Sequence, residues 1–288
     1  MWLCGYTPSN VVLKPTELVV PVPIVQLDAE WDFGLALDVN GCVWKFGSFL
    51  GSQTFSNFER EEGIPPAQSV VVQRNFGLIL DKEGAVWGTF SDSNKLSYNP
   101  PARASVSEYH MRKFSSLIGI QAIAAGHTHC LFLDHNGVVW VYGNNRTGQI
   151  GLCETLDVNT PIALELEFPI AAISCGVWHS LLLDVERRVW GCGQNDSGQL
   201  GLGDFYFRNT PVNIPNLPQI AVVCAGNNHS LFIDEDGKVW GCGRNTMGEL
   251  GIKKVSFQNK AVPISLPTKL RKCFLGQEFA NKMKSARC

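Results

Sequence analysis

Apolar residues along the chain fall into short runs separated by turn residues. Runs such as Ser180–Asp184 (SLLLD) and Arg188–Cys192 (RVWGC) have the length of strands. An aspartate is followed shortly afterwards by a glycine, as in Asp134 and Gly137. This pair is typical of tight hairpins, because glycine tolerates a positive φ and aspartate accepts hydrogen bonds from nearby backbone. The pattern predicts short antiparallel strands with no convincing helix between them.

The strands repeat with a period of 50 residues. Three segments that begin at Gly126, Gly176 and Gly226 align without gaps. Four short antiparallel strands per repeat, joined by turns, form a propeller blade. The matching positions are His129, His179 and His229; Asp134, Asp184 and Asp234; Trp140, Trp190 and Trp240; and Gly151, Gly201 and Gly251.

Weaker copies of the repeat precede these three, around Asp38 and Asp81, with Phe33 and Phe76 in place of the histidine. The two ends of the chain also fit the repeat. Residues 2–5 resemble residues 240–243, and residues 270–279 align with residues 220–229. We therefore expect one all-β domain over residues 1–288, a β-propeller of about six blades whose ring is closed by the terminal strands. The expected blades cover residues 24–66, 67–119, 120–169, 170–219, 220–269, and 270–288 completed by 1–23.

Composition fits a folded globular protein, with 45% hydrophobic and 17% charged residues. The formal net charge of −2 conceals a basic C-terminal region after residue 243, which is either a solvated face or an edge for an acidic partner or nucleic acid. Neither a signal peptide nor an apolar run long enough to span a membrane is found, so we expect a cytoplasmic or nuclear protein. The ten cysteines lack CxxC spacing, which favours reduced structural thiols over disulfides or zinc.

The repeat reads glycine, two residues, His-Ser-Leu, Asp, Val-Trp, Gly-x-Asn and Gly-Gln-Leu-Gly, most clearly between residues 176 and 202. It resembles the repeat of the regulator-of-chromosome-condensation family. The resemblance implies a propeller whose loops bind proteins. The founding member of the family catalyses guanine-nucleotide exchange on a Ran-type GTPase while it is bound to chromatin. This chain differs from the founder in two features. The founder has seven blades, whereas we count about six here, and the founder's basic N-terminal tail is missing here.

The repeated polar residues suggest a catalytic triad only superficially. His179 and Ser180 are neighbours on one strand and point to opposite faces, so the histidine cannot readily take the serine proton. We therefore interpret the repeated histidines and aspartates as structural residues that hold turns. The repeated tryptophans are expected to pack between adjacent blades. No phosphate-binding glycine motif occurs, and we expect no catalytic residue, cofactor or metal.

Partner contacts are expected where the chain departs from the repeat. Trp31 and Trp178 lie outside the tryptophan register, at loop positions. The polar segment 91–116 replaces a regular turn; it is either a degenerate loop or a protruding feature like the founder's wedge. Acidic loop residues could also contact a basic surface of a GTPase. The candidate contact residues are Trp31, Tyr98, Arg103, Tyr109, His110, Arg112, Trp178, Asp196 and Asp204.

Three functions compete for this chain. The first is a noncatalytic protein-interaction module, expected to be monomeric. The second is a guanine-nucleotide exchange factor for a Ran-like small GTPase, which needs only tighter binding to the nucleotide-free form. The third, and weakest, is association with chromatin or nucleic acid through the basic C-terminal region, because no long basic arm with interleaved aromatic residues is present.

Overall fold

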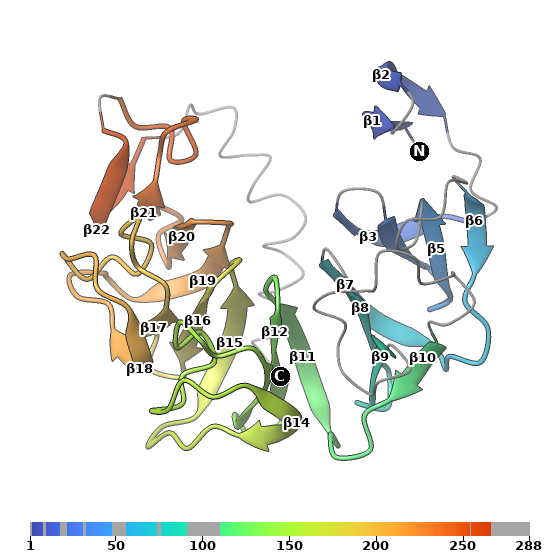
Figure 1. Cartoon of the computed structure of the whole chain (residues 1–288), viewed down its shortest axis with the longest axis horizontal. Helices are drawn as coiled ribbons and strands as arrows, with labels where there is room; N and C mark the ends of the chain where they lie inside the picture. Colours follow the sequence, from blue (N-terminus) through green and yellow to red (C-terminus); the bar gives the residue numbers. More distant parts are fainter. Residues whose placement is uncertain are drawn as a thin grey trace. The chain divides into compact units, whose positions relative to one another are not determined.

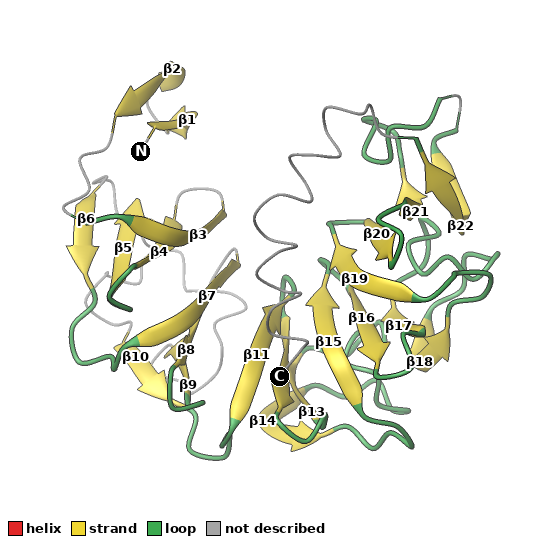
Figure 2. Cartoon of the chain, turned by 180° about the vertical axis from the view of Figure 1, so that it is seen from behind, coloured by secondary structure: helices red, strands yellow, loops and turns green. Residues whose placement is uncertain are grey.

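The computed structural model describes residues 2–7, 10–17, 22–30, 33–47, 56–73, 76–90, 110–253 and 255–265. Every regular element in these ranges is a β-strand (Figure 2). The same ranges contain no helix, and therefore none that is long and apolar enough to cross a membrane.

The strands form five four-stranded antiparallel sheets and one pair, each sheet built from strands consecutive in sequence (Figure 1). The pair joins β1 (Trp2–Thr7) and β2 (Asn10–Glu17). The sheets are β3 (Ile24–Glu30), β4 (Phe33–Asp38), β5 (Val43–Gly47) and β6 (Ser56–Arg60); β7 (Ala67–Gln73), β8 (Phe76–Asp81), β9 (Val86–Phe90) and β10 (His110–Lys113); β11 (Ile120–Ala125), β12 (His129–Asp134), β13 (Val139–Gly143) and β14 (Val158–Ala163); β15 (Ile170–Cys175), β16 (His179–Asp184), β17 (Val189–Gly193) and β18 (Arg208–Asn213); and β19 (Ile220–Ala225), β20 (His229–Asp234), β21 (Val239–Arg244) and β22 (Phe257–Ile264).

The residues of the inner and outer strands suit their positions in the sheets. The central strand β16 is buried along its whole length, whereas the residues of the outer strand β18 are exposed or half-buried. Outer strands have a free edge that another chain could pair with, and proline removes one of the donors from that edge. Pro161, Pro211 and Pro263 lie in the outer strands β14, β18 and β22.

Two compact units divide the chain. The first comprises residues 1–128, 132–135 and 159–161, and the second comprises residues 129–131, 136–158 and 162–288. In the first unit, Leu35 and Leu37 of β4 belong to one buried cluster with Val70 and Val72 of β7. In the second unit, Leu181 and Leu183 of β16 belong to one buried cluster that also contains residues of β19 and β20. In both units, apolar side chains of one sheet pack against those of the next sheet along the chain.

The strands β1 and β2 pair antiparallel, with Trp2 opposite Glu17 and Tyr6 opposite Val11. Residues 270–288, which the sequence assigns to the same blade, lie outside the described residues. The sixth blade and the closure of the ring by the two ends of the chain therefore stay predictions.

Candidate functional site at the loop end of β15–β18

Two connections meet at one end of the sheet β15–β18, because its strands alternate in direction. They are residues 176–178 between β15 and β16, and residues 194–207 between β17 and β18. We call these two connections the loop end. The amide of Gln194 donates to the carbonyl of Trp178 at 2.8 Å, and the Gln194 side chain donates to Asp196 Oδ2 at 2.7 Å. Trp178, Asp196 and Asp204, three of the expected contact residues, thus lie at the same end of one sheet.

A buried asparagine fixes the longer connection at both ends. The Asn195 side chain accepts a hydrogen bond from the Leu200 amide at 2.9 Å and donates to the Asp204 carbonyl at 3.0 Å. Asn145 bonds the matching groups, the Ile150 amide and the Glu154 carbonyl, whereas Asn245 accepts from the matching Leu250 amide but donates to the carbonyls of Ile252 and Val255. The asparagine of the Asn-x-x-Gly turn therefore holds a loop of more than ten residues in one conformation.

An ion pair fixes the part of this connection that faces solvent. Arg208 Nη2 lies 2.6 Å from Asp204 Oδ2, and Arg208 Nη1 donates to the carbonyls of Tyr206 at 2.7 Å and Phe207 at 3.3 Å. The Tyr206 amide donates to Asp204 Oδ1 at 3.0 Å. Burial alone would raise the pKa of Asp204, but the hydrogen bonds from Arg208 and the Tyr206 amide outweigh it and the pKa lies below its ordinary value.

Three aromatic side chains project from this clamped backbone into solvent. Phe205 is 48% exposed, Tyr206 is 76% exposed and Phe207 is 45% exposed. We call these residues the aromatic loop. Isolated exposed apolar residues are ordinary, but three consecutive aromatic residues on a rigid backbone present the kind of side chain that dominates protein interfaces.

The aromatic loop was not among the contact residues predicted from the sequence. The matching residues are Thr155, Leu156 and Asp157 in one neighbouring repeat and Val255, Ser256 and Phe257 in the other. The sequence did contain a signal for this loop. Three consecutive aromatic residues occupy a turn at which the adjacent repeats have both polar and apolar residues. Asp204, an expected contact residue, is bonded to Arg208 and to the loop backbone, and its contact with a partner stays a prediction.

A second apolar feature lies in the connection between β13 and β14. A hollow of about 370 Å³ is lined by Leu152, Cys153, Glu154, Leu156, Asp157, Val158 and Ile162. Leu156 is 68% exposed at this hollow. The preceding turn contacts the start of β18, since a Cβ placed on Gly148 would lie 2.6 Å from the Arg208 carbonyl oxygen. The hollow and the aromatic loop thus belong to matching connections of adjacent sheets.

The repeated histidines and serines bond between sheets rather than within a turn. His179 Nε2 lies 2.9 Å from Ser230 Oγ, and His129 Nε2 lies 3.0 Å from Ser180 Oγ. Ser230 Oγ donates to the Gln199 carbonyl at 2.7 Å, so its lone pairs receive the Nε2–H of neutral His179. We expected the histidines to hold turns. The side chains of His129 and His179 instead link one sheet to the next.

Burial makes the His179–Ser230 pair unsuited to nucleophilic catalysis. Both side chains have no exposed surface, so no substrate could reach the serine oxygen. Burial, and then the nearby His129 and His229, lower the pKa of His179 to about 3. A Cβ on Gly176 would lie 2.2 Å from the His179 ring, which explains why glycine stands three residues before the histidine.

The repeated aspartates anchor hairpins through a tryptophan. Asp184 Oδ2 accepts from Trp190 Nε1 at 2.9 Å, and Asp184 Oδ1 accepts from the Arg188 amide at 2.9 Å. Asp38, Asp81 and Asp234 accept from their own tryptophans in the same way. Burial raises the pKa of Asp184, but the hydrogen bonds from Trp190 and Arg188 outweigh it and lower the pKa overall. The Trp190 ring stacks on Phe168, with 4.3 Å between ring centroids, where the preceding repeat meets this sheet.

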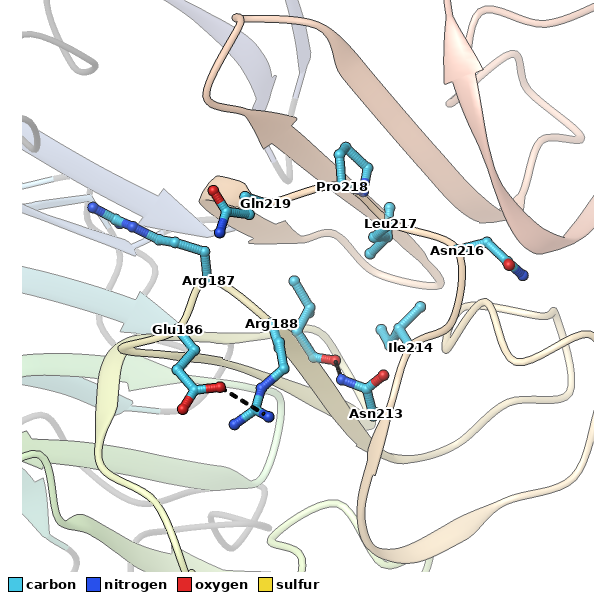
Figure 3. Close-up of a pocket in the computed structure, with 10 residues that line it drawn as sticks. Glu186, Arg187, Arg188, Asn213, Ile214, Asn216, Leu217, Pro218 and Gln219 are labelled. Atoms are coloured by element: carbon cyan, nitrogen blue, oxygen red, sulfur yellow. Dashed lines mark hydrogen bonds and ion pairs between the residues drawn. The ribbon is translucent and has the colours of Figure 1, made fainter.

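The opposite end of the same sheet carries another hollow, of about 230 Å³, between the β16–β17 hairpin and residues 213–219 (Figure 3). Its arginines are already paired. Arg188 lies 2.7 Å from Asp184 and 3.0 Å from Glu186, and Arg187 lies 3.6 Å from Glu235. These pairs account for both positive charges within the fold, so this hollow is a weaker candidate for partner binding than the loop end.

Several expected contact residues cannot be assigned to a site. Trp31, Tyr98, Arg103 and Tyr109 lie outside the described residues, and most of the segment 91–116 does too. His110 and Arg112 lie in β10, where Arg112 is exposed. Their roles in partner binding stay predictions.

Comparisons with known proteins identify the repeat. Residues 136–183 and 188–233 match a family described as Regulator of chromosome condensation (RCC1) repeat, and residues 170–199 and 220–249 match a second model of that description. These matches span about two fifths of the chain. Among curated protein sequences, none matches the chain significantly.

Solved structures share the fold. The chain is similar to Prp20p from Saccharomyces cerevisiae, with a TM-score of 0.73 and 23% identity, covering 84% of this chain and 63% of Prp20p. It is also similar to human WBSCR16, with a TM-score of 0.75 and 18% identity, covering 91% of this chain and 73% of WBSCR16. The chain thus spans less than two thirds of the Prp20p chain. The four-stranded sheets and these likenesses confirm the predicted all-β class and the β-propeller, and the family matches confirm the repeat type.

Proposed function

Because the chain carries RCC1 repeats in a β-propeller fold, we propose that it is a noncatalytic protein-interaction module that binds its partner through the loop end of β15–β18. The observation that carries this proposal is the aromatic loop, residues 205–207. Its side chains leave between 45% and 76% of their surface exposed, although its backbone is held by Asp204, Arg208 and Asn195.

Preorganisation is the physical reason that this arrangement suits binding. A flexible loop loses side-chain and backbone entropy when a partner orders it, and that loss subtracts from affinity. The Asp204–Arg208 clamp and the hydrogen bonds to the carbonyls of Tyr206 and Phe207 have already ordered this backbone. Aromatic side chains add a large contact area with few rotatable bonds.

Quantitative affinity capture from cells tests the proposal. We expect partners captured by the native chain to be lost by more than tenfold when Phe205, Tyr206 and Phe207 are all replaced by serine. A matched variant replaces Leu217 and Pro218, which line the hollow at the opposite end, with serine. Equal loss in both variants, or no loss in the aromatic variant, would contradict the proposed surface. A thermal melt of each variant separates lost binding from lost folding.

Guanine-nucleotide exchange on a Ran-like small GTPase is the second candidate. The likeness to Prp20p supports it, because Prp20p was described together with its binding to Gsp1p and histones. Release of fluorescent GDP from a purified Ran-type GTPase, with the native chain and with a variant lacking residues 94–111, tests this candidate. Acceleration that disappears in the variant supports exchange through that segment, whereas unchanged release at micromolar protein contradicts exchange.

Cytoplasmic or nuclear location belongs to the same proposal, and a fluorescent fusion of the chain in cells tests it. Association with nucleic acid is the weakest candidate. Most of the basic C-terminal region that suggested it lies outside the described residues.

A further inference from the structure

The charges around the aromatic loop define what its partner must present. In residues 144–158 and 194–208, Arg146 and Arg208 stand against Glu154, Asp157, Asp196 and Asp204. Two arginines against four carboxylates leave these connections with a formal charge of −2. Arg208 is paired with Asp204, so its charge is largely compensated locally.

Asp196 differs from the other aspartate of its loop. Its carboxylate is exposed and held in position, with Oδ2 accepting from Gln194 at 2.7 Å and Oδ1 accepting from Ser197 at 3.3 Å. No ion pair to Asp196 occurs among the described residues, whereas Asp204 has Arg208. The adjacent repeats carry Arg146 and Thr246 at the matching position, so the carboxylate is specific to this sheet. A carboxylate has room for several donors, and only one is supplied at each oxygen of Asp196 by these bonds.

Resting on the function proposed above, we infer that the partner is a protein surface on which apolar side chains are flanked by arginine or lysine. The apolar side chains pack on the aromatic loop and in the hollow beside Leu156, while a cation pairs with Asp196. Such a pair sets specificity and association rate, because opposite charges steer the encounter and like charges oppose it. Desolvated aromatic contacts then supply most of the affinity.

A membrane surface fits these connections less well. An exposed aromatic loop can enter a bilayer interface, but binding to anionic headgroups relies on unpaired lysine or arginine beside it. Here one exposed cation, Lys260 of β22, lies beside Gly203, whereas Glu154, Asp157 and Asp196 are exposed carboxylates of the two connections. The arginine of the loop, Arg208, is bonded to Asp204 and the loop backbone. The exposed carboxylates repel an anionic surface and favour a cationic protein partner.

Two synthetic peptides of equal length and apolar content test the inference. One is LRRLLRRLLRRL and the other is LEELLEELLEEL, both labelled for fluorescence anisotropy and titrated with the full chain. We expect the arginine peptide to bind at least tenfold more tightly at low salt, with the difference shrinking as salt rises. Asp196→Asn should weaken binding of the arginine peptide about fivefold. Glu165→Gln, an exposed carboxylate in the β14–β15 connection, is the matched control and should change nothing.

The outcomes separate this inference from the proposed function. Equal binding of both peptides, lost in Tyr206→Ser, would overturn the charge inference and leave the aromatic loop as a binding surface. Peptide binding that Tyr206→Ser leaves unchanged would overturn both. Phosphatidylcholine vesicles form a further arm: binding of the chain to them that depends on Tyr206, without preference for the arginine peptide, would overturn the inference in favour of a membrane surface.

Discussion

Acid should destabilise the fold well before its carboxylates are protonated, because His179 is buried in its neutral form. The pKa of His179 is about 3 in the fold, mainly through burial, against an ordinary value of 6.5. The unfolded chain therefore binds a proton between these values that the folded chain does not bind. The contribution of His179 is fully present above the unfolded pKa and is lost as the pH falls from 6.5 towards 3.

The magnitude follows from linkage. Each pH unit within that window costs about 1.4 kcal/mol for each such histidine. Lowering the pH from 7 to 5 should therefore reduce the free energy of unfolding by about 2 kcal/mol through His179 alone, a sizeable share of the roughly 5–15 kcal/mol of an ordinary domain. Ordinary carboxylates titrate near pH 4, so this interval reports mainly on histidine.

Urea unfolding at pH 7, 6 and 5, followed by tryptophan fluorescence, measures this effect. The control variant is His179→Gln, whose side chain is neutral and can still donate to Ser230. We expect the variant to lose about 2 kcal/mol less than the native chain between pH 7 and 5. Parallel pH profiles for the two chains would refute the assignment of a neutral, buried His179.

Further variants test other parts of the fold. Ser230→Ala leaves the His179 Nε2–H without its partner and the Gln199 carbonyl with only the weak Cys242 thiol donor, which should cost about 2–4 kcal/mol in urea unfolding, while Ser256→Ala at an exposed position should change little. Arg187 has a φ of 66° where the other hairpins have glycine, so Arg187→Gly should stabilise by about 1 kcal/mol; a lower melting temperature would contradict the strain argument. Removing Met1–Gly5 should lower the melting temperature, because we propose that β1 and β2 complete a blade with residues 270–288; an unchanged value would contradict that blade.

The blades could be predicted from the sequence because each repeat contains the residues that form its own turns. Hairpins end in aspartate and glycine, and the tryptophan six residues after the aspartate bonds the same carboxylate in four of the sheets. These are local interactions, so spacing alone reveals them. Arg187 is the exception: it adopts a left-handed conformation without glycine, at a position that the repeat nonetheless predicts to be a turn.

Contacts between repeats were harder to predict. Because His179 and Ser180 are neighbours on one strand, the sequence excluded a hydrogen bond between their side chains. The alignment of the repeats does not show that His179 bonds Ser230, 51 residues away. The aromatic loop was missed for another reason. The ion pair between Asp204 and Arg208 that holds this backbone is not part of the repeat, because the matching residues are Glu154 and Val158 in one neighbour and Lys254 and Gln258 in the other.

A site-specific photocrosslink tests most directly whether the loop end binds a partner. A photoreactive phenylalanine analogue would replace Tyr206 in one chain and Glu186, at the opposite end of the same sheet, in another. We predict that the chain modified at residue 206 crosslinks in cells to a discrete protein, and that the chain modified at residue 186 does not crosslink to that protein. Crosslinking from residue 186 alone, or identical products from both positions, would contradict the proposed binding surface.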